Sequence, residues 1–239
     1  MPHLFHHIGL IHSPYKEKFA VPRQPGLVTC AKGELEILAP YNDLNAFNGL
    51  EAFSHLWLIF VFHKNNNIAK SNGWSPTVRP PRLGGNERMG VFATRSPFRP
   101  NPIGLSQVRY HGLRQADGKI FLQLSEIDLV DGTPIIDIKP YIPYADSNPA
   151  ALAGFAQEKP EGIMDVHFSS LALQKVQQVN TRYPELQQLI KEVLQQDPRP
   201  AYKKKKVDDK IYAVNLSDFN ISWRNDDSTV TVLDIESIA

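Results

Sequence analysis

The sequence contains a single cysteine, Cys30, and has no apolar run that approaches the length needed to cross a bilayer. One cysteine cannot form an internal disulfide, and secreted chains of this size usually carry several, so we expect a reducing, cytoplasmic environment and an ordinary thiol. The first residues also lack a basic segment followed by an apolar core of signal-peptide length. We therefore expect a protein that is neither exported nor held in a membrane.

Several motifs that are common in enzymes are also missing. The chain has no GxxxxGK[ST] phosphate loop, no HExxH, no GxSxG, no CxxC pair and no GxGxxG after a predicted strand. The lack of the last motif argues against a Rossmann sheet, so a nucleotide cofactor would have to bind by another route. No metal site is predicted.

The two halves of the 239-residue chain differ in texture. Up to about Tyr144, short apolar runs alternate with Gly, Pro and Asn, which is typical of strands and turns. Residues 55–63, HLWLIFVFH, are apolar on both alternating faces and predict a fully buried strand. We expect further strands in GVFATRS, IGLSQVRYHGL and IFLQLSEIDLV, with a turn at Asp117-Gly118 between the last two. A barrel or closed sheet is the expected architecture of this half.

The second half begins with a stretch rich in Pro, Ala, Gly and Ser that has no sustained periodicity and predicts a linker. Helical apolar spacing follows, interrupted at Pro184, so two helices are expected. IYAVNLSDFNISW and STVTVLDI then show strand-type alternation, with a turn at Asp226-Asp227. The predicted organisation is mainly β, with a first domain over 1–144, a linker over 145–162 and a smaller C-terminal α+β domain over 163–239.

The segment from Arg79 to Gly104 has a strong local charge, although the whole chain carries a formal net charge of only +1. The segment contains five arginines and one acid, Glu87, so its local net charge is +4. Five prolines stiffen the loops, and guanidinium groups on rigid loops suit phosphates and carboxylates. The alternative is that the prolines make tight turns while the arginines lie over the surface and pair with carboxylates. The arginines are Arg79, Arg82, Arg88, Arg95 and Arg99.

Five strings, in this order, closely resemble the TsaA-like (TrmO) family: YKEKFAVPRQPGL, LEAFSHLWLIFVFH, RPPRLGGNERMGVFATRSPFRPNPIGLS, DLVDGTPIIDIKPY and QDPRPAY. The resemblance covers nearly the entire chain. It implies an S-adenosylmethionine-dependent enzyme that methylates N6 of threonylcarbamoyladenosine at position 37 of threonine-codon-reading tRNAs. It also implies an antiparallel β-barrel methyltransferase domain without a Rossmann sheet, and a homodimer with the cofactor near the subunit contact.

The resemblance also places the cofactor contacts. By motif they fall on Gln24, Pro25, Gly26, Leu27, His63, Lys64, Arg95, Leu105, Asp128, Leu129, Val130 and Asp131. Gly26 permits close backbone approach, and Asp128 or Asp131 would accept hydrogen bonds from the adenosine or attract the cationic centre. Taken alone, these two acids would be turn formers and His63 an ordinary strand-end residue. The polar run after His63, KNNNIAKSNGW, is longer than its family counterpart and receives no role.

Methyl transfer to N6 requires alignment of the groups and removal of one proton. Asp131 and His63 are the candidate catalytic residues. Arg95 and Arg99 are suited to the threonyl carboxylate or to a tRNA phosphate, and the residues alone do not choose between these tasks. The run DPRPAYKKKK would attract phosphates and stack Tyr202 on a base, although four adjacent lysines are more often a solvated loop. The expected tRNA contacts are Arg79, Arg82, Arg99, Arg199, Tyr202 and Lys203.

Two other functions fit the same residues. One is a regulatory module that binds S-adenosylmethionine and recruits a partner, because the same cofactor contacts would serve it. The other is a non-catalytic tRNA-binding protein that uses the arginines and lysines as a phosphate clamp.

Overall fold

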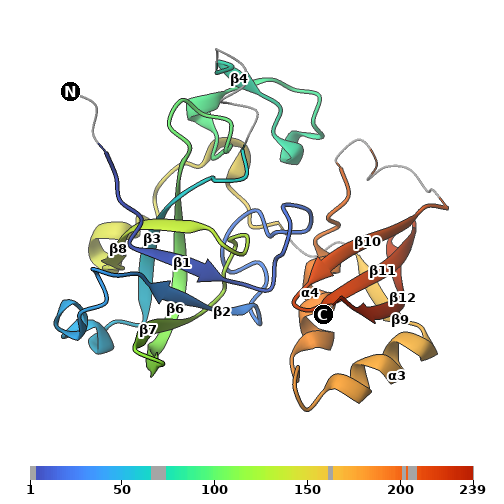
Figure 1. Ribbon diagram of the computed structural model, residues 1–239. Helices are drawn as coiled ribbons and strands as arrows, with labels where there is room; N and C mark the ends of the chain where they lie inside the picture. The colour runs from blue at the N-terminus through green and yellow to red at the C-terminus, as the bar shows by residue number, and fades with distance from the viewer. Residues whose placement is uncertain (1–3, 66–73, 161–163, 201–202, 204–208, 239) are drawn as a thin grey trace.

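The computed structural model describes residues 4–65, 74–160, 164–200, 203 and 209–238. The chain forms two bodies that lie side by side, a larger sheet structure from the first half and a smaller α+β body from the second (Figure 1). A long loop from the first half lies between them (Figure 1). The predicted mainly β fold with a smaller C-terminal domain is therefore confirmed.

Six strands build the larger body: β1 (Gly9–His12), β2 (Lys32–Ile37), β3 (His55–Val61), β6 (Ile103–Ala116), β7 (Lys119–Ser125) and β8 (Pro134–Pro140). All of their pairings are antiparallel, and the order β1-β2-β7-β6-β3-β8 returns to β1. The returning pair, β8 with β1, is short, with two matched residue pairs. Two short 3-10 helices, η1 (Leu44–Phe47) and η2 (Leu50–Ala52), lie between β2 and β3, and a third, η3 (Pro81–Leu83), lies between β3 and β6.

β3 shows how one face of this sheet forms the core. Leu56, Leu58 and Phe60 are buried, whereas the residues between them are partly exposed. The prediction that this strand is buried on both faces is wrong, because the outward face of the sheet is only partly covered. Gly104 lies opposite Phe60, and a Cβ on it would come 2.2 Å from the ring. A glycine is therefore required where the aromatic ring crosses the neighbouring strand.

In the first half, one predicted turn is confirmed and one predicted strand is not. Asp117 and Gly118 have φ values of +52° and +72°, and they join β6 to β7 in the predicted hairpin. GVFATRS is not a strand, however. β4 (Thr77–Val78) pairs with β5 (Met89–Gly90), and the chain then turns into the 3-10 helix η4 (Val91–Ala93). The Thr94 hydroxyl closes this turn by donating to the Val91 carbonyl at 2.9 Å.

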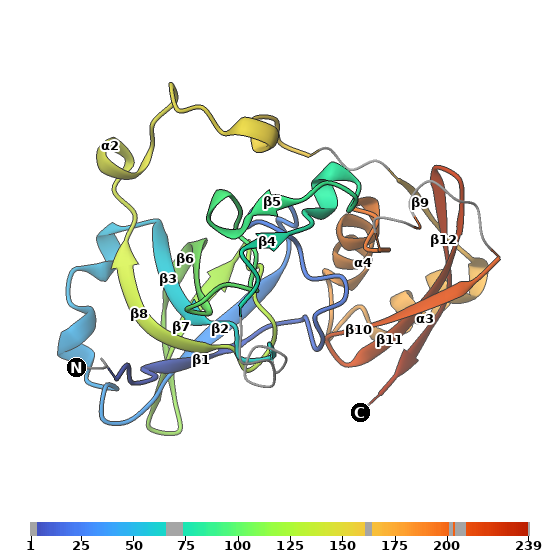
Figure 2. The ribbon, with the colours of Figure 1, turned by 90° about the horizontal axis from the view of Figure 1, so that it is seen from above.

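The predicted linker crosses from the larger body to the smaller one as an extended chain with two short helices, α2 (Pro143–Asp146) and η5 (Gly154–Ala156) (Figure 2). Arg82 of the first half donates to the Glu158 carbonyl of this segment. The linker is therefore attached to the arginine-rich loops.

The smaller body combines two helices with a four-stranded sheet of order β10-β11-β12-β9. Its elements are β9 (Asp165–Phe168), α3 (Ser170–Val179), α4 (Leu186–Gln195), β10 (Ile211–Leu216), β11 (Phe219–Asp226) and β12 (Thr229–Ser237). The two helices and the break near Pro184 are confirmed. IYAVNLSDFNISW holds two strands, not one, because the chain reverses at Ser217, where φ is +52°. The next turn centres on Asp227 and Ser228.

The two bodies share part of a hydrophobic core. Tyr15, Val28 and Ala31 come from the loop between β1 and β2, yet they are buried in the core of the C-terminal body. Phe19 of the same loop stacks on Trp223 with ring centroids 5.9 Å apart. The loop therefore belongs to the first half by sequence and to the second by packing.

Candidate functional site

The loop between β1 and β2 meets the arginine-rich segment at Gln24. The Arg95 guanidinium donates to the Gln24 side-chain carbonyl. Two residues further on, Gly26 donates its backbone N–H to the Glu126 carbonyl at 3.4 Å and has a φ of +70°. Such a φ favours glycine, and the missing side chain leaves the backbone open to close approach. Three predicted regions, 24–27, Arg95 and the segment after β7, thus lie together.

Asp128 is the most unusual acid of this region. Burial raises the pKa of its carboxyl group to about 6, against the opposing effects of a hydrogen bond from the Ser106 hydroxyl and the charge of Arg95. The shift places its titration close to neutral pH. A carboxylate held in such surroundings suits a cationic or hydrogen-bond-donating ligand.

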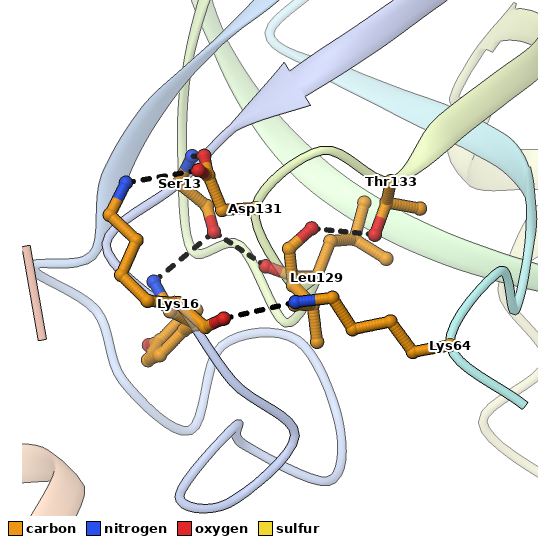
Figure 3. A network of polar contacts seen from close by, with 8 residues as sticks. Ser13, Lys16, Lys64, Leu129, Asp131 and Thr133 are labelled. Carbon is orange, nitrogen blue, oxygen red and sulfur yellow. Dashed lines mark hydrogen bonds and ion pairs between the residues drawn. The ribbon is translucent and has the colours of Figure 1, made fainter. Parts of the chain in front are cut away.

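Asp131 has a different environment, shown in Figure 3. One carboxylate oxygen accepts from the Ser13 N–H at 2.8 Å, and the other accepts from the Lys16 ammonium at 3.0 Å. The Ser13 hydroxyl donates to the Leu129 carbonyl at 2.7 Å, and Thr133 donates to the Val130 carbonyl at 2.6 Å. These contacts fix the chain from 128 to 131 against the start of the β1–β2 loop.

Lys64, shortly after the end of β3, contacts the same network, and His63 precedes it in the chain. Lys64 donates to the Lys16 carbonyl at 3.0 Å (Figure 3). Burial lowers the pKa of His63, and the positive charges of Lys64 and Lys18 lower it further. The imidazole is therefore neutral at pH 7 and able to accept a proton.

Leu105 lies apart from these residues. It is 55% exposed on the outer face of β6, whereas the adjacent Ser106 points inward to Asp128. Successive side chains of a strand face opposite sides of the sheet. Leu105 therefore points away from the carboxylate that Ser106 contacts, and the structure does not bring it into the same cluster within one chain.

The arginines divide into exposed and partly covered groups. Arg79, Arg82, Arg88 and Arg95 are exposed, whereas Arg99 is partly buried and donates to the Thr94 carbonyl at 3.3 Å. Two exposed aromatic residues accompany the first group. Trp74 lies shortly before β4 and Phe92 lies in η4 directly after β5, with ring centroids 5.9 Å apart.

The predicted tRNA contact at Arg199 is not supported by its environment. Its side chain is 1% exposed and forms a buried ion pair with Asp197 at 2.8 Å, so the guanidinium does not face solvent. The correction has a physical cause, because an acid two residues away allows the arginine to be buried as a pair. Tyr202 lies outside the described residues, and Lys203 is partly buried.

Other chemical features are simple. Burial raises the pKa of the Cys30 thiol to about 12, and the nearby Glu192 carboxylate adds to this effect, so the thiol is unreactive at neutral pH. Within the described ranges, no group of three or more His, Cys, Asp or Glu side chains is arranged to hold a metal ion. Nor does any helix among those residues have the length and apolar character to cross a bilayer.

Comparison with known proteins identifies the family. A family model described as the tRNA-methyltransferase O N-terminal domain matches residues 10–147, and one described as the TrmO C-terminal domain matches residues 161–238. The chain belongs to the TrmO family. The resemblance read from the sequence is thereby confirmed.

Individual relatives of this TrmO-family chain agree with that assignment. It is 55% identical over 232 residues to the tRNA (adenine(37)-N6)-methyltransferase of Escherichia coli K12, with 97% of each chain covered. A Pseudomonas aeruginosa relative, named as a putative S-adenosylmethionine-dependent methyltransferase, is 46% identical over 93% of each chain. The crystal structure of TrmO from Pseudomonas aeruginosa superposes with a TM-score of 0.80 at 38% identity, covering 99% of both chains.

The candidate site of this TrmO-family chain contains supporting residues that the sequence prediction missed. Lys16 and Ser13 hold Asp131, Ser106 holds Asp128, and the Glu126 carbonyl accepts from Gly26. Lys16 and Ser106 lie within the strings that match the family, which was a usable signal. Ser13 and Glu126 make their contacts largely through backbone groups or to backbone groups, and such contacts cannot be predicted from residue type.

Proposed function

We propose that this chain is a tRNA (adenine(37)-N6)-methyltransferase that depends on S-adenosylmethionine. The observation that carries the proposal is the 55% identity to the Escherichia coli enzyme of that name over 97% of both chains. Several of the residues carried over by motif take part in contacts between neighbouring segments, which supports a shared site: Arg95 with Gln24, Asp131 and Lys64 with Lys16, and Asp128 with Ser106. The finer substrate that we propose is threonylcarbamoyladenosine in tRNAs that read threonine codons.

The residues of the network fit S-adenosylmethionine. When bound, that cofactor supplies an electrophilic methyl group on a positively charged sulfur. The carboxyl of Asp128, with its pKa of about 6, offers a negative charge for a cationic ligand, and Gly26, which has a φ of +70° and no side chain, permits close approach to the loop. Gln24, Pro25 and Leu27 complete this loop, and His63, Lys64, Arg95 and the segment from Asp128 to Asp131 border it.

Proton removal from N6 falls, in this proposal, to His63 or Asp131. Burial and the positive charges of Lys64 and Lys18 lower the pKa of the His63 imidazole, so the neutral ring can accept a proton. Asp131 already accepts from Ser13 and Lys16, so its basicity is reduced by contacts that also hold the loop. His63 is the stronger of the two candidates, since it does not have to leave a structural role to accept a proton.

The exposed ribbon of β4 and β5 is the proposed tRNA surface. Arg79 and Arg82 supply cations for phosphates, and Trp74 with Phe92 supplies flat faces for unstacked bases. Single-stranded loops of RNA are bound in this manner, because their bases are free to stack on aromatic side chains. Arg99 and Lys203 are further proposed contacts, Arg99 with the threonyl carboxylate or a phosphate.

We further propose a cytoplasmic homodimer whose antiparallel barrel domain, without a Rossmann sheet, spans 1–144, followed by a linker at 145–162 and a C-terminal domain at 163–239. The pairing order that returns to β1 supports the barrel. Leu105 supports the dimer. Because it is exposed and faces away from Asp128, a contact between Leu105 and the cofactor requires the site of a second copy.

The test is transfer of the methyl group from labelled S-adenosylmethionine to tRNA that carries threonylcarbamoyladenosine. We expect label in that tRNA and none in tRNA that carries unmodified adenosine at position 37. Cofactor binding without transfer to any tRNA would favour a regulatory module. RNA binding that is indifferent to cofactor analogues would favour a non-catalytic tRNA-binding protein.

A further inference from the structure

The loop between β1 and β2 is held at its first arm by the C-terminal body. The Ser217 N–H donates to the Pro14 carbonyl at 2.7 Å, and the Asn215 N–H donates to the Glu17 carboxylate at 3.0 Å. Tyr15 forms a bridge with Leu216 of β10, and Phe19 stacks on Trp223. The loop thus continues the edge of the C-terminal sheet.

The second arm of the loop is held by helix α4. Glu192 accepts from the Thr29 N–H at 2.5 Å and from the Cys30 N–H at 3.3 Å, and the Thr29 hydroxyl donates to the same carboxylate at 3.2 Å. Gln188, one turn earlier, donates to Glu192 at 2.8 Å. Although burial opposes it, these donors lower the pKa of Glu192, so the carboxylate is charged at neutral pH.

The tip between the two arms carries the residues assigned to the cofactor. Gln24 contacts Arg95, and Gly26 contacts the Glu126 carbonyl, so the tip faces the sheet body and not the C-terminal body. Val28 and Ala31, directly after the tip, are buried in the C-terminal core. A loop that is fixed at both arms has little freedom at its tip, because few residues separate the fixed points.

We propose that the C-terminal domain positions the loop between β1 and β2 for cofactor binding. In this proposal Glu192 is the positioning residue that fixes where residues 24–27 lie relative to the sheet. This inference rests on the proposed function, because it takes those residues as cofactor contacts. Glu192 does not touch the reacting atoms. It acts through the amides of Thr29 and Cys30, and its effect is on cofactor affinity.

A second charged contact between the same elements provides a matched control. Lys32 and Glu185 form an ion pair at 2.6 Å, with side chains that are 65% and 43% exposed. This pair is solvated and holds no backbone N–H of the loop, so it contributes little. Glu192 lies on α4 and Glu185 directly precedes this helix, and both contact the chain between Thr29 and Lys32. Only Glu192 accepts hydrogen bonds from backbone N–H groups of the arm that follows the tip.

The experiment measures the dissociation constant of S-adenosylmethionine by calorimetry, the KM for the cofactor, kcat and the melting temperature, on the full chain. For Glu192→Ala we expect the dissociation constant and KM to rise about tenfold, because cofactor binding must then supply the ordering of the loop that Glu192 otherwise supplies. We expect kcat at saturation to change less than about twofold. Glu192→Gln retains a carbonyl acceptor and is expected to restore most of the affinity. Glu185→Ala is expected to match the unaltered protein.

Unchanged affinity in Glu192→Ala, or an equal loss in Glu185→Ala, would overturn the proposal. If Glu192→Ala fails to fold, Gln188→Ala is the second test, because it removes a donor to Glu192 on the exposed helix face. A rise of about threefold in the dissociation constant supports the proposal, and no rise overturns it. If the unaltered protein itself does not bind S-adenosylmethionine, the proposed function fails first, and this outcome is distinct from the others.

Discussion

Two segments of this chain combine arginine with proline, but their arginine side chains differ in solvent exposure. In the segment from Arg79 to Gly104 most guanidinium groups reach solvent. In the segment after α4, Arg199 is buried in an ion pair with Asp197. The composition of both segments predicted contact with a polyanion, but Arg199 is buried whereas most arginines of the first segment are exposed.

The difference lies in the acids that accompany the arginines. Asp197 stands two residues before Arg199, and its carboxylate accepts hydrogen bonds from the guanidinium while both side chains are buried. In the first segment Glu87 is exposed, and five arginines outnumber it. Local pairing in sequence therefore separates an arginine that stabilises the fold from one that is available to a ligand.

Replacing the buried arginine should have the largest effect, a loss of folding stability. Arg199→Ala leaves the Asp197 carboxylate buried without its partner, which typically costs about 3–5 kcal/mol in the free energy of unfolding. Urea unfolding of this variant and of Arg224→Ala, an exposed arginine on β11, measures the difference. Equal stability of the two variants would show that the buried pair is not structural.

The next effect concerns activity. Arg95→Ala removes the contact with Gln24 and the positive charge near Asp128, and we expect kcat/KM to fall about 100-fold with little change in melting temperature. The matched control is Arg109→Ala, an exposed arginine further along β6. If both variants lose activity equally, Arg95 has no special place in the site.

A smaller effect concerns pH. Because burial raises the pKa of Asp128 to about 6, its carboxylate is present above that pH and is lost as the pH falls through it. If the negative charge binds the cofactor, affinity for S-adenosylmethionine falls by up to about tenfold per pH unit below pH 6. Asp128→Asn should bind weakly at every pH and lose this dependence. Asp137→Asn, at a partly exposed acid of β8, should retain it, and a flat profile in the unaltered protein would contradict the assignment.

The smallest expected effect concerns the aromatic pair Trp74 and Phe92, next to β4 and β5. Stacking on a base is worth about 1–3 kcal/mol, so Trp74→Ala should raise the KM for tRNA about five- to tenfold and leave the KM for the cofactor unchanged. Trp74→Phe should retain most of the binding. Tyr144→Ala, at an aromatic residue that is 90% exposed on α2, is the control. Tryptophan fluorescence should fall when an anticodon stem-loop binds, and a fall that persists in Trp74→Phe would exclude Trp74 as its source.

Local signals in the sequence predicted much of the fold. Asp117-Gly118 gave the hairpin because both residues tolerate positive φ, and Pro184 separated the two helices because it cannot continue the first. The motifs also pointed to residues 24–27, 63–64, 95 and 128–131, and the structure gives hydrogen bonds to Gln24, Lys64, Arg95 and Asp128 among them. These features depend on neighbours in the chain.

The features that were missed depend on distant partners. Ser217 turns the chain inside an apolar alternation, and its backbone is bonded to Pro14, about 200 residues earlier. β9 is a strand only because it pairs with β12, more than 60 residues later. Burial of Tyr15 and Val28 in the C-terminal core follows from packing that periodicity does not encode. The environment of Asp128 likewise arises from Ser106 and Arg95 on other segments.

Mass spectrometry of tRNA nucleosides gives a direct test of the proposal that this chain methylates threonylcarbamoyladenosine in tRNA. Cells with the gene should contain N6-methylated threonylcarbamoyladenosine, and cells without it should contain the unmethylated nucleoside in equal total amount. Restoration by the unaltered gene, but not by Arg95→Ala, would tie the modification to the site described. Identical nucleoside profiles with and without the gene would contradict the account.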